Sequence, residues 1–389
     1  MKRVLIFSTA YVPFIGGAEV AIREIADRLA GSYEFDLITA RFSTTVPAKE
    51  RIGTVTVHRI GIGVPLVDKL WLPWGGALKA LQLNRTHRYG LFWGMMATYG
   101  TGAAYIANWF IRPRVPIILT LQEGDSEQYL RTKWAGLVDL SWRLALHFAD
   151  ALTVISNYLG ARARRLGYRG DIAFIPNAVN TEHFSQPIST AERAETRKAI
   201  GLADGDVALV TTSRLVKKNA VDDVIRAMVL LPENVHFIVY GIGPDEEALR
   251  ALAKEQGVEG RVHFMGQIGH AQMPRALKSC DIFIRPSRSE GMGNSFIEAM
   301  AAKLPVIATQ EGGIADFLFD AKRNPDAETT GWAVDKDAPE EIAAAVEDII
   351  EHPEQAARVV ATAKRLAFEQ YDWRLIAARM KTLFDRLLG

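Results

Sequence analysis

Cysteine is nearly absent from this sequence of 389 residues, since Cys280 is its one cysteine. An internal disulfide is therefore impossible, and this cysteine usage fits a protein of the reducing cytosol. Cys280 directly precedes an apolar segment, residues 281–285. We interpret its thiol as an inert packing group rather than a nucleophile, and we expect a cytoplasmic protein.

Long apolar runs and a large net charge are also missing. No stretch reaches 18 uninterrupted apolar residues, which argues against a transmembrane helix, and the apolar start, Met1–Phe7, is too short for the core of a signal peptide. The net charge is +1, but residues 1–186 hold 21 Lys and Arg against 14 Asp and Glu, whereas residues 187–389 hold 25 against 31. A basic first half suits anionic lipid or an anionic substrate. No nucleic-acid motif is present, so we expect no nucleic-acid partner.

The chain has the length of two domains, and short apolar runs alternate with helical patterns in both halves, which predicts α/β domains with parallel sheets. We expect a first Rossmann-like domain at residues 1–186, a polar linker at 185–195 and a second Rossmann-like domain at 187–370. The last helix, about 371–389, has no strand after it and is expected to pack back onto the first domain. Helical periodicity also marks residues 18–30 and 134–148. Expected strands are 4–7, 35–39, 55–60, 117–121, 151–155, 172–175, 207–212, 236–240, 262–265, 282–285 and 306–309.

The most informative segment joins an expected strand to an expected helix between residues 285 and 302. Its loop contains Gly291 and Gly293 and is flanked by Glu290 and Glu298. A glycine-containing turn before a helix presents backbone N–H groups and the positive end of the helix dipole, which suits a phosphate. Carboxylates suit sugar hydroxyl groups, so the segment predicts a nucleotide-sugar site. The structural alternative is a capping box, in which Glu298 reaches back to the helix start at Ser295.

Other clusters also follow expected strands. Arg214 and Lys218 come after 207–212, where their charges could stabilise a departing phosphate; the alternative is a solvated basic loop. Gly16 and Gly17 precede the first helix, where glycines allow the backbone to approach an anion closely, although such a pair is also common in plain turns. The remaining glycine loops at strand ends are 241–244, 266–268 and 311–313.

Taken in order, the segments 16–19, 175–180 with Phe184, 214–219, 241–243 and 290–300 resemble the retaining family-4 glycosyltransferases of GT-B fold, over nearly the whole chain. The resemblance implies two Rossmann-like domains facing each other across a cleft, with the C-terminal helix crossing back to the first. It implies that Arg214 and Lys218 hold the donor diphosphate, Glu290 the sugar hydroxyls and Glu298 the ribose. The other donor-binding residues that it implies are Gly16, Gly17, Gly241, Gly266, Gln267, Ile268, Gly291, Met292, Gly293, Asn294, Ser295 and Phe296.

The chain departs from the family pattern in two places. Lys217 precedes Lys218, so either lysine could be the diphosphate ligand. Where many members carry a His-Asp pair, this chain has Gln122, Glu123 and Asp125, and a glutamine cannot act as an acid or base near neutral pH. We expect these three residues on the acceptor side of the site, with helix capping as the alternative for the carboxylates.

No metal and no cofactor beyond the nucleotide-sugar co-substrate is expected. The eight histidines form no cluster with the spacing of metal ligands. Asp222 and Asp223 are adjacent, so their side chains point apart on the helix that they start. Arg214 and Lys218 could replace a divalent ion electrostatically.

Aromatic and basic residues are interleaved between residues 70 and 114. This mixture suits the interfacial region of a bilayer, and so a lipid-linked acceptor and a peripheral position at the inner membrane face. The alternative for each tryptophan is packing in the domain core. The residues are Trp71, Trp74, Trp93, Tyr99, Tyr105, Trp109, Lys79, Arg85, Arg88, Arg112 and Arg114.

We therefore expect a metal-independent enzyme that moves a hexose from a UDP- or GDP-sugar to a hydroxyl group, with retention of anomeric configuration. The acceptor would be a glycan, a glycolipid or a small molecule. In the mechanism that the resemblance implies, the leaving diphosphate helps to deprotonate the acceptor. The alternatives are a nucleotide-sugar epimerase, which needs no acceptor, a phosphorylase, which consumes inorganic phosphate, and a non-catalytic scaffold that binds sugar or lipid.

Overall fold

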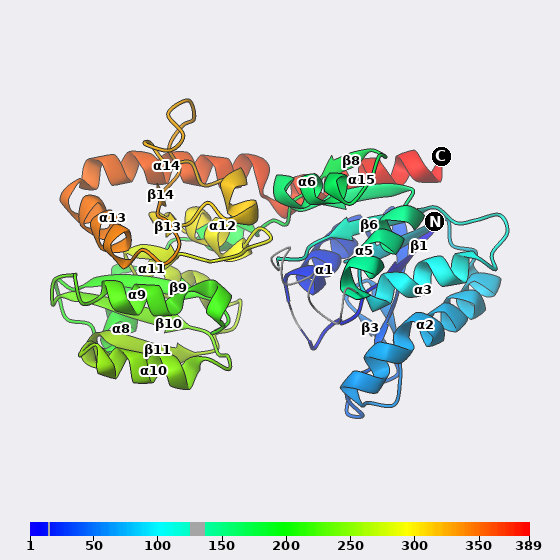
Figure 1. Ribbon diagram of the computed structural model, residues 1–389, viewed down its shortest axis with the longest axis horizontal. Coiled ribbons are helices and arrows are strands. Elements are labelled where there is room, and N and C mark those ends of the chain that lie inside the picture. The colour runs from blue at the N-terminus through cyan, green and yellow to red at the C-terminus, as the bar shows by residue number, and fades with distance from the viewer. Residues whose placement is uncertain (15, 125–136) are drawn as a thin grey trace. The chain divides into compact units, whose positions relative to one another are not determined.

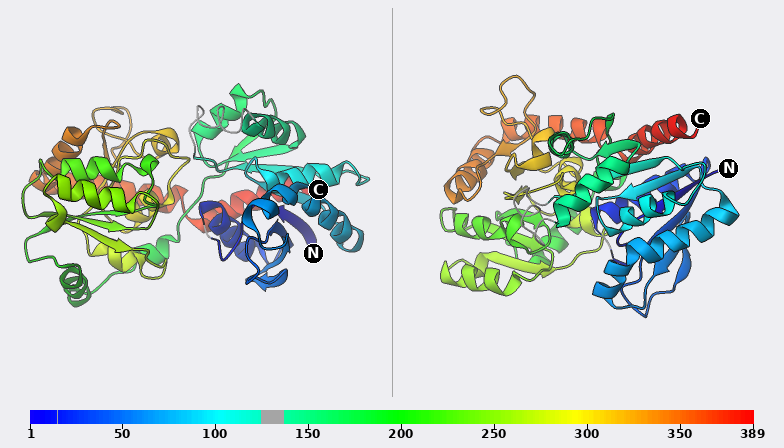
Figure 2. Two further views of the ribbon diagram at one scale, coloured as in Figure 1. Left: turned by 60° about the horizontal axis from the view of Figure 1, so that its bottom comes forward. Right: turned by 45° about the vertical axis from the view of Figure 1, so that its right-hand side comes forward.

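The computed structural model describes residues 1–14, 16–124 and 137–389. The chain divides into two compact units (Figure 1): the first joins Met1–Asn177 to Trp373–Gly389, and the second is Ala178–Asp372. Each unit contains a mainly parallel sheet with helices packed on it, as the alternating sequence pattern predicted. Figure 2 shows the two units from other sides.

The division falls before the expected boundary at residue 186, so residues 178–186 belong to the second unit. Val179 donates its backbone N–H to the carbonyl of Tyr371 at 2.9 Å and forms an isolated parallel bridge with Asp372. The hydroxyl of Thr181 also donates to the carboxylate of Asp372. Hydrogen bonding therefore attaches this segment to the second unit.

The strands of the first unit follow the order β3-β4-β2-β1-β5-β6-β7-β8, and neighbouring strands are parallel except for the edge pair β3–β4. The order reverses at β1, so β1 and β5 flank the switch point of this sheet. Val4–Phe7 are fully buried because the interior strands are covered on both faces. The strands are β1 Lys2–Phe7, β2 Tyr33–Ala40, β3 Lys49–Ile52, β4 Val55–Ile60, β5 Leu91–Met95, β6 Ile117–Leu121, β7 Ala151–Val154 and β8 Ile172–Phe174.

Strand β5 and helices α2, Pro65–His87, and α3, Tyr99–Asn108, were not predicted. Strand β5 is completely buried, and a Cβ on its Gly94 would lie 2.7 Å from the hydroxyl oxygen of Thr101 in α3. Trp93 is 1% exposed. It belongs to the core, so the alternative of core packing is confirmed for Trp93 and its place in a membrane-facing surface was wrong.

The last helix, α15, packs on the first unit, as expected. The Tyr33 hydroxyl donates to Asp385 at 2.5 Å, and the ring of Phe384 meets that of Tyr33 edge-on at 5.4 Å. The expected helix at 134–148 is confirmed over its described part. The helices of this unit besides α2 and α3 are α1 Gly17–Leu29, α5 Leu137–Phe148, α6 Asn157–Arg165 and α15 Trp373–Leu388.

The strands of the second unit follow the order β11-β10-β9-β12-β13-β14, and all neighbouring strands are parallel. Strands β9 and β12 flank the point where the order reverses. Open α/β sheets bind ligands outside the carboxyl ends of the strands at such a point. The strands are β9 Val207–Thr212, β10 Val235–Tyr240, β11 Val262–Gly266, β12 Ile282–Arg285, β13 Val306–Ala308 and β14 Trp332–Ala333.

The linker expected at 185–195 was wrong, because helix α8 begins at Thr190. Ser189 and Glu192 form a capping box: the Ser189 hydroxyl accepts the Glu192 N–H at 3.1 Å, and the Glu192 carboxylate accepts the Ser189 N–H at 2.9 Å. In α8 only Ile200 is buried, so its sequence has the polarity of a linker. The helices of this unit are α7 Thr181–Ser185, α8 Thr190–Ile200, α9 Val221–Ala227, α10 Glu246–Glu255, α11 Met273–Lys278, α12 Asn294–Ala301, α13 Pro339–Glu351 and α14 Pro353–Gln370, with short 3₁₀ turns η2 Lys217–Asn219, η3 Glu259–Arg261 and η4 Gly312–Asp316.

Candidate functional site

Loops at the carboxyl ends of the second unit's strands are joined by backbone hydrogen bonds. The Arg288 N–H, in the loop after β12, donates to the carbonyl of Lys218, in the loop after β9, at 2.7 Å. The Gly313 N–H, after β13, donates to the carbonyl of Glu290 at 3.1 Å. The structure thus brings the loops that hold the predicted phosphate and sugar ligands together at the switch point of one sheet.

Two glycines permit this close approach of neighbouring loops. A Cβ on Gly241, after β10, would lie 1.7 Å from the carbonyl oxygen of Ser213, and one on Gly312 would lie 2.0 Å from that of Glu290. Their φ angles are 145° and 61°, which disfavour other residues as well. Gly241 also donates its N–H at 2.8 Å to the carbonyl of Gly266, which ends β11. The predicted glycine loops therefore form one continuous rim.

Arg285, the last residue of β12, is a site residue that the sequence analysis treated only as the end of a strand. Its guanidinium donates to Glu290 Oε2 at 2.7 Å and to Ser295 Oγ at 2.8 Å, and it lies 4.2 Å from the ring centroid of Phe296. The side chain is 7% exposed, and burial lowers the pKa of Arg285. The sequence held one indication of this role: an arginine stands at the carboxyl end of an otherwise apolar strand, where ligands bind in such sheets.

Glu290 is held at both carboxylate oxygens. Oε2 accepts from Arg285, and Oε1 accepts the N–H of Gly291 at 2.9 Å. These two hydrogen bonds fix the direction of the carboxylate. The side chain is 16% exposed, so the carboxylate still reaches the surface in part. Gly293 completes the arrangement, because a Cβ there would lie 2.6 Å from the Arg285 guanidinium.

Glu298 lies one turn into helix α12, and its side chain is 15% exposed. The capping-box alternative was wrong: α12 begins at Asn294 after Gly293, whose φ is 85°, and the Ser295 hydroxyl accepts from Arg285 instead. Nε2 of His270 lies 3.8 Å from the Glu298 carboxylate. Burial raises the pKa of Glu298 to about 7.

This raised pKa predicts a pH dependence of stability. The ordinary pKa of glutamate is 4.5, so between about pH 4.5 and pH 7 the folded chain holds more protons at this position than the unfolded chain. The free energy of unfolding should therefore fall as the pH rises through this window and level off above it. Urea unfolding of Glu298→Gln should lose this part of the slope; an unchanged slope would show that Glu298 titrates normally.

The remaining predicted donor ligands fall into two groups. Met292 and Phe296 are buried, with 2% and 0% exposure, so only their main chains could meet a ligand. Gly291 is buried as well, whereas the others lie on the same rim with at least part of their surface accessible. They are Gly266, Gln267, Ile268, Gly293, Asn294 and Ser295.

The predicted diphosphate ligands occupy a firmly held loop. Arg214 is exposed, and no hydrogen bond or ion pair involves its guanidinium within the described residues. Lys217 is exposed and Lys218 is half-buried, so the structure leaves either as the diphosphate ligand. Asn219 donates from Nδ2 to the carbonyl of Arg214 at 2.6 Å and fixes the loop from within.

Arg288 joins this loop to the helix that follows it. Its guanidinium donates to the carbonyl of Lys217 and to Asp222, both at 2.7–2.8 Å, and to Asp223 at 2.8 Å. It also pairs with Asp337 at 2.6 Å. Because Nη2 of Arg288 donates to both Asp222 and Asp223, the expectation that these adjacent side chains point apart was wrong. Both aspartates of the possible metal-binding pair are engaged by arginine.

The first unit has a smaller polar group at the carboxyl ends of β6 and β8. Gln122 and Asn177 exchange two amide hydrogen bonds of 3.0 and 3.1 Å, and a Cβ on Gly17 would lie 3.7 Å from Asn177 Nδ2. Gly16 donates its N–H to Glu19 at 2.8 Å, so this amide is already used. The structure therefore brings the predicted residues Gly17 and Gln122 close to each other.

Glu123 is 5% exposed and serves the backbone. Its carboxylate accepts the N–H groups of Ala97, at 2.6 Å, and Gln122, at 2.9 Å, and burial raises its pKa. It ties the loop after β5 to that after β6, which favours the structural alternative for this carboxylate. Asp125 lies outside the described residues.

Two family models match the chain: residues 15–183 match "Glycosyltransferase Family 4", and residues 192–366 match "Glycosyl transferases group 1". The GDP-mannose-dependent alpha-(1-6)-phosphatidylinositol monomannoside mannosyltransferase of Mycolicibacterium smegmatis is 32% identical over 61% of this chain, and the matched region spans 62% of that relative. The alpha-monoglucosyldiacylglycerol synthase of Acholeplasma laidlawii is 23% identical over 82% of this chain and 83% of its own length.

Solved structures resemble the chain over its full length. Sucrose-phosphate synthase from Thermosynechococcus elongatus has a TM-score of 0.86 at 20% identity, covering 100% of this chain and 99% of the other. Anabaena HepE in complex with UDP and glucose has a TM-score of 0.81 at 19% identity, covering 99% and 100%. At these identities the similarity shows the fold alone, and the two family models show the family. The chain therefore belongs to the glycosyltransferases of GT-B fold, with a family-4 amino-terminal half and a group-1 carboxyl-terminal half.

Proposed function

We propose that this chain transfers a hexose from a nucleoside diphosphate sugar to an acceptor hydroxyl group, with retention of anomeric configuration. One observation carries the proposal. At the switch point of the second sheet, Arg288 ties the loop of Arg214 and Lys218 to the loop of Glu290, whose carboxylate is fixed by Arg285. Cations for a diphosphate and an oriented carboxylate for a sugar thus occur in one place.

The proposed division of labour follows from charge and position. Arg214, with Lys217 or Lys218, would stabilise the negative charge that develops on the leaving diphosphate. Glu290 would accept hydrogen bonds from sugar hydroxyl groups. Glu298 would accept hydrogen bonds from the ribose once it is ionised. The departing phosphate would receive the acceptor's proton, so that no separate protein base is required.

The identity of the donor is tested by ligand stabilisation. The mannosyltransferase relatives are named for GDP-mannose, which makes GDP-mannose our first candidate and UDP-glucose our second. A ligand at about 100 times its dissociation constant should add about 2.7 kcal/mol to the stability of the fold. Failure of GDP, UDP and their hexose derivatives to raise the melting temperature would contradict the proposal. Hexose transfer that requires an acceptor and ignores inorganic phosphate would exclude the epimerase and the phosphorylase.

We propose further that transfer does not depend on a divalent metal. The cations of the rim would take the place of the ion, and Asp222 and Asp223 are engaged by Arg288. Transfer rates measured with excess EDTA should equal those measured with added Mg²⁺. A complete loss of turnover in EDTA that Mg²⁺ restores would show that the rim cations are insufficient.

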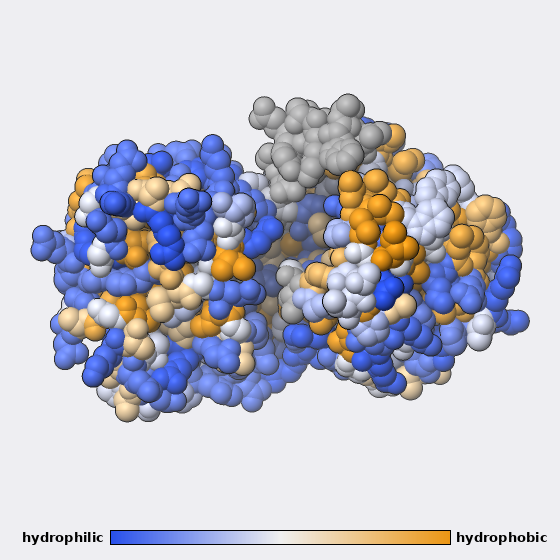
Figure 3. Space-filling model, turned by 90° about the horizontal axis from the view of Figure 1, so that it is seen from below, coloured by the Kyte–Doolittle hydropathy of each residue, from blue (hydrophilic) through white to orange (hydrophobic). Residues whose placement is uncertain are grey.

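An exposed apolar face on helix α2 supports a lipid-linked acceptor at a membrane surface. The face follows helical spacing, and the one acidic residue of α2, Asp68, is buried and accepts the N–H groups of Phe42, Ile62 and Gly63. Figure 3 shows apolar side chains gathered on the first unit. The exposed apolar residues of this α2 face are Leu66, Val67, Leu70, Trp71, Trp74 and Leu78. Lys69 and Arg85 are exposed cations of the same helix, and the exposed Arg88 directly follows it.

An apolar stripe with tryptophan and cations, and no exposed carboxylate, suits the headgroup region of an anionic bilayer. The relatives named above include enzymes whose names specify phosphatidylinositol and diacylglycerol substrates. No helix within residues 1–14, 16–124 and 137–389 is long and apolar enough to cross a membrane. We therefore propose reversible docking through the α2 face.

The docking is tested by flotation with vesicles that contain phosphatidylglycerol. Trp71→Ser/Trp74→Ser should lower the bound fraction about tenfold or more, because each tryptophan contributes a kcal/mol or more of apolar burial. The matched control is Val229→Ser/Leu230→Ser, which alters two equally exposed apolar residues of the second unit. Equal binding by all three proteins would contradict docking through α2.

A further inference from the structure

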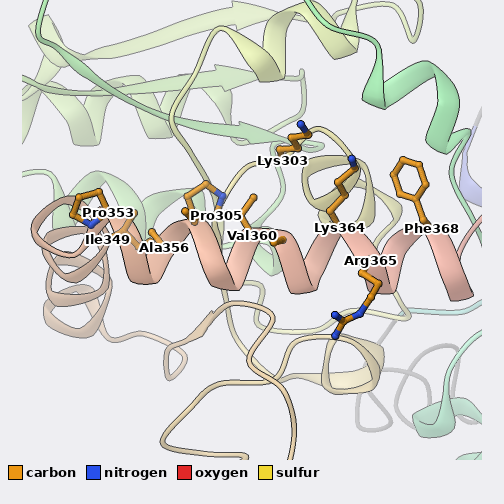
Figure 4. Close-up of a pocket in the computed structure, with 11 residues that line it drawn as sticks. Lys303, Pro305, Ile349, Pro353, Ala356, Val360, Lys364, Arg365 and Phe368 are labelled. Atoms are coloured by element: carbon orange, nitrogen blue, oxygen red, sulfur yellow. The ribbon is translucent and has the colours of Figure 1, made fainter.

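A second ligand-sized hollow lies on the second unit, away from the rim described above. It is a groove of about 880 Å³ between helix α14, the end of α13 and the segment that precedes β13 (Figure 4). Pro305, which lines it, comes immediately before β13. The groove therefore opens at the amino ends of the parallel strands, whereas the candidate transfer site lies at their carboxyl ends.

The groove is long and mostly apolar. Its lining residues on α14 extend from Pro353 to Phe368, a length of about 22 Å at 1.5 Å per residue. Ala356, Ala357 and Ala361 supply small side chains along this length. Its volume lies within the usual range of about 300–1,000 Å³ for pockets that bind small molecules.

One part of the groove carries positive charge without a balancing carboxylate. Lys303 and Lys364 both line it, and within the described residues neither forms an ion pair. The Lys364 ammonium lies 5.1 Å from the ring centroid of Phe368. Figure 4 shows Lys303, Lys364 and Phe368 on one side of α14 and Arg365 on the other, where Arg365 pairs with Glu328.

A third lysine, Lys278, is affected by the positive charge of Lys303 and Lys364. Lys278, at the end of α11, has its pKa lowered by burial, and the charges of Lys303 and Lys364 lower it further. Lys278 is therefore close enough to both Lys303 and Lys364 for their charges to act on it. A bound anion would relieve this repulsion, whereas an uncharged apolar ligand would not.

We propose that this groove binds a long-chain fatty acid, with its carboxylate between Lys303 and Lys364 and its acyl chain along α14 toward Ile349 and Pro353. Inorganic phosphate would leave the apolar length of the groove uncovered, and a neutral alkane would leave the lysines unpaired. A single unbranched chain with one anionic end matches both features. This ligand is additional to the donor and the acceptor of the proposed transfer reaction.

The test uses palmitate below its micellar concentration and calorimetric titration of the full chain. Because docking of lipid at α2 is a separate proposal, the titrations use protein that carries Trp71→Ser/Trp74→Ser. Saturable binding at one site is expected, weakening about fourfold for each methylene removed in shorter acids. Lys303→Gln/Lys364→Gln should weaken binding about tenfold or more, and Ala361→Trp should block the groove. Arg358→Gln, an exposed cation on α14 outside the groove, should have no effect.

Three outcomes would overturn the proposal. Palmitate shows no saturable binding; binding does not depend on chain length; or Lys303→Gln/Lys364→Gln and Ala361→Trp bind as the parent does while retaining its melting temperature. Nucleotide stabilisation, measured on the same proteins, should be unaffected by palmitate and by these substitutions. A failure of the groove and a failure of the transfer proposal are therefore separate results.

Discussion

Replacing Arg214 with alanine is expected to lower kcat/KM for hexose transfer by about 10²–10³, the usual effect of removing one preorganised group that stabilises transition-state charge. The stability should change by less than about 0.5 kcal/mol, because the side chain is exposed and has no partner in the described structure. Steady-state kinetics and urea unfolding of the same preparation separate the two effects.

Two companion variants make this result specific. Arg214→Lys keeps the charge but loses the planar fork that matches two phosphate oxygens, so it should fall between the parent and the alanine variant. Lys254→Ala removes an exposed cation from helix α10 and should leave turnover unchanged. If Arg214→Ala transfers hexose as fast as the parent, Arg214 is not the diphosphate ligand.

Replacing Arg285 with methionine is expected to destabilise the fold by about 3 kcal/mol. Methionine can fill much of the space, but it leaves the partly buried Glu290 carboxylate without its cation, and breaking a buried pair in this way typically costs about 3–5 kcal/mol. We expect the lower end because Glu290 retains 16% exposure. Urea unfolding measures the loss.

The double variant Arg285→Met/Glu290→Gln distinguishes loss of the pair from loss of packing. A neutral glutamine no longer needs the guanidinium, so the double variant should regain a large part of the lost stability. If single and double variants are equally unstable, the cost is one of packing around Phe296. Both should transfer hexose poorly, since Glu290 is either misplaced or uncharged.

Much of the fold was predictable because its signals are local. Short apolar runs marked most strands within one or two residues, and glycines at their ends marked positions such as Gly241 and Gly312 where another backbone passes closely. All strands of the second sheet are parallel, so their carboxyl ends lie at one edge. The loop of Arg214 and Lys218 and the loop of Glu290 each follow a strand, and the sequence alone therefore predicted them at the same edge.

What could not be predicted depends on contacts between distant residues. Arg285 matters because Glu290, Ser295 and Phe296 surround it, and none of these contacts changes the pattern of the strand that it ends. Likewise, the burial of Glu123 depends on the N–H of Ala97, which lies in the loop after a strand that was not predicted. The α8 helix resembled a linker because its contacts are mainly ionic, including those of Arg193 and Arg197 with Asp281.

The first unit is discontinuous in sequence, and this affects the order in which the protein can be completed. Residues 1–177 leave the ribosome early, but helix α15, which packs on Tyr33 through Phe384, is made only after the whole second unit. Residues 178–372 form a continuous unit that can finish folding first. Until α15 has been made, the amino-terminal unit lacks the helix whose Phe384 packs against Tyr33 and Phe35.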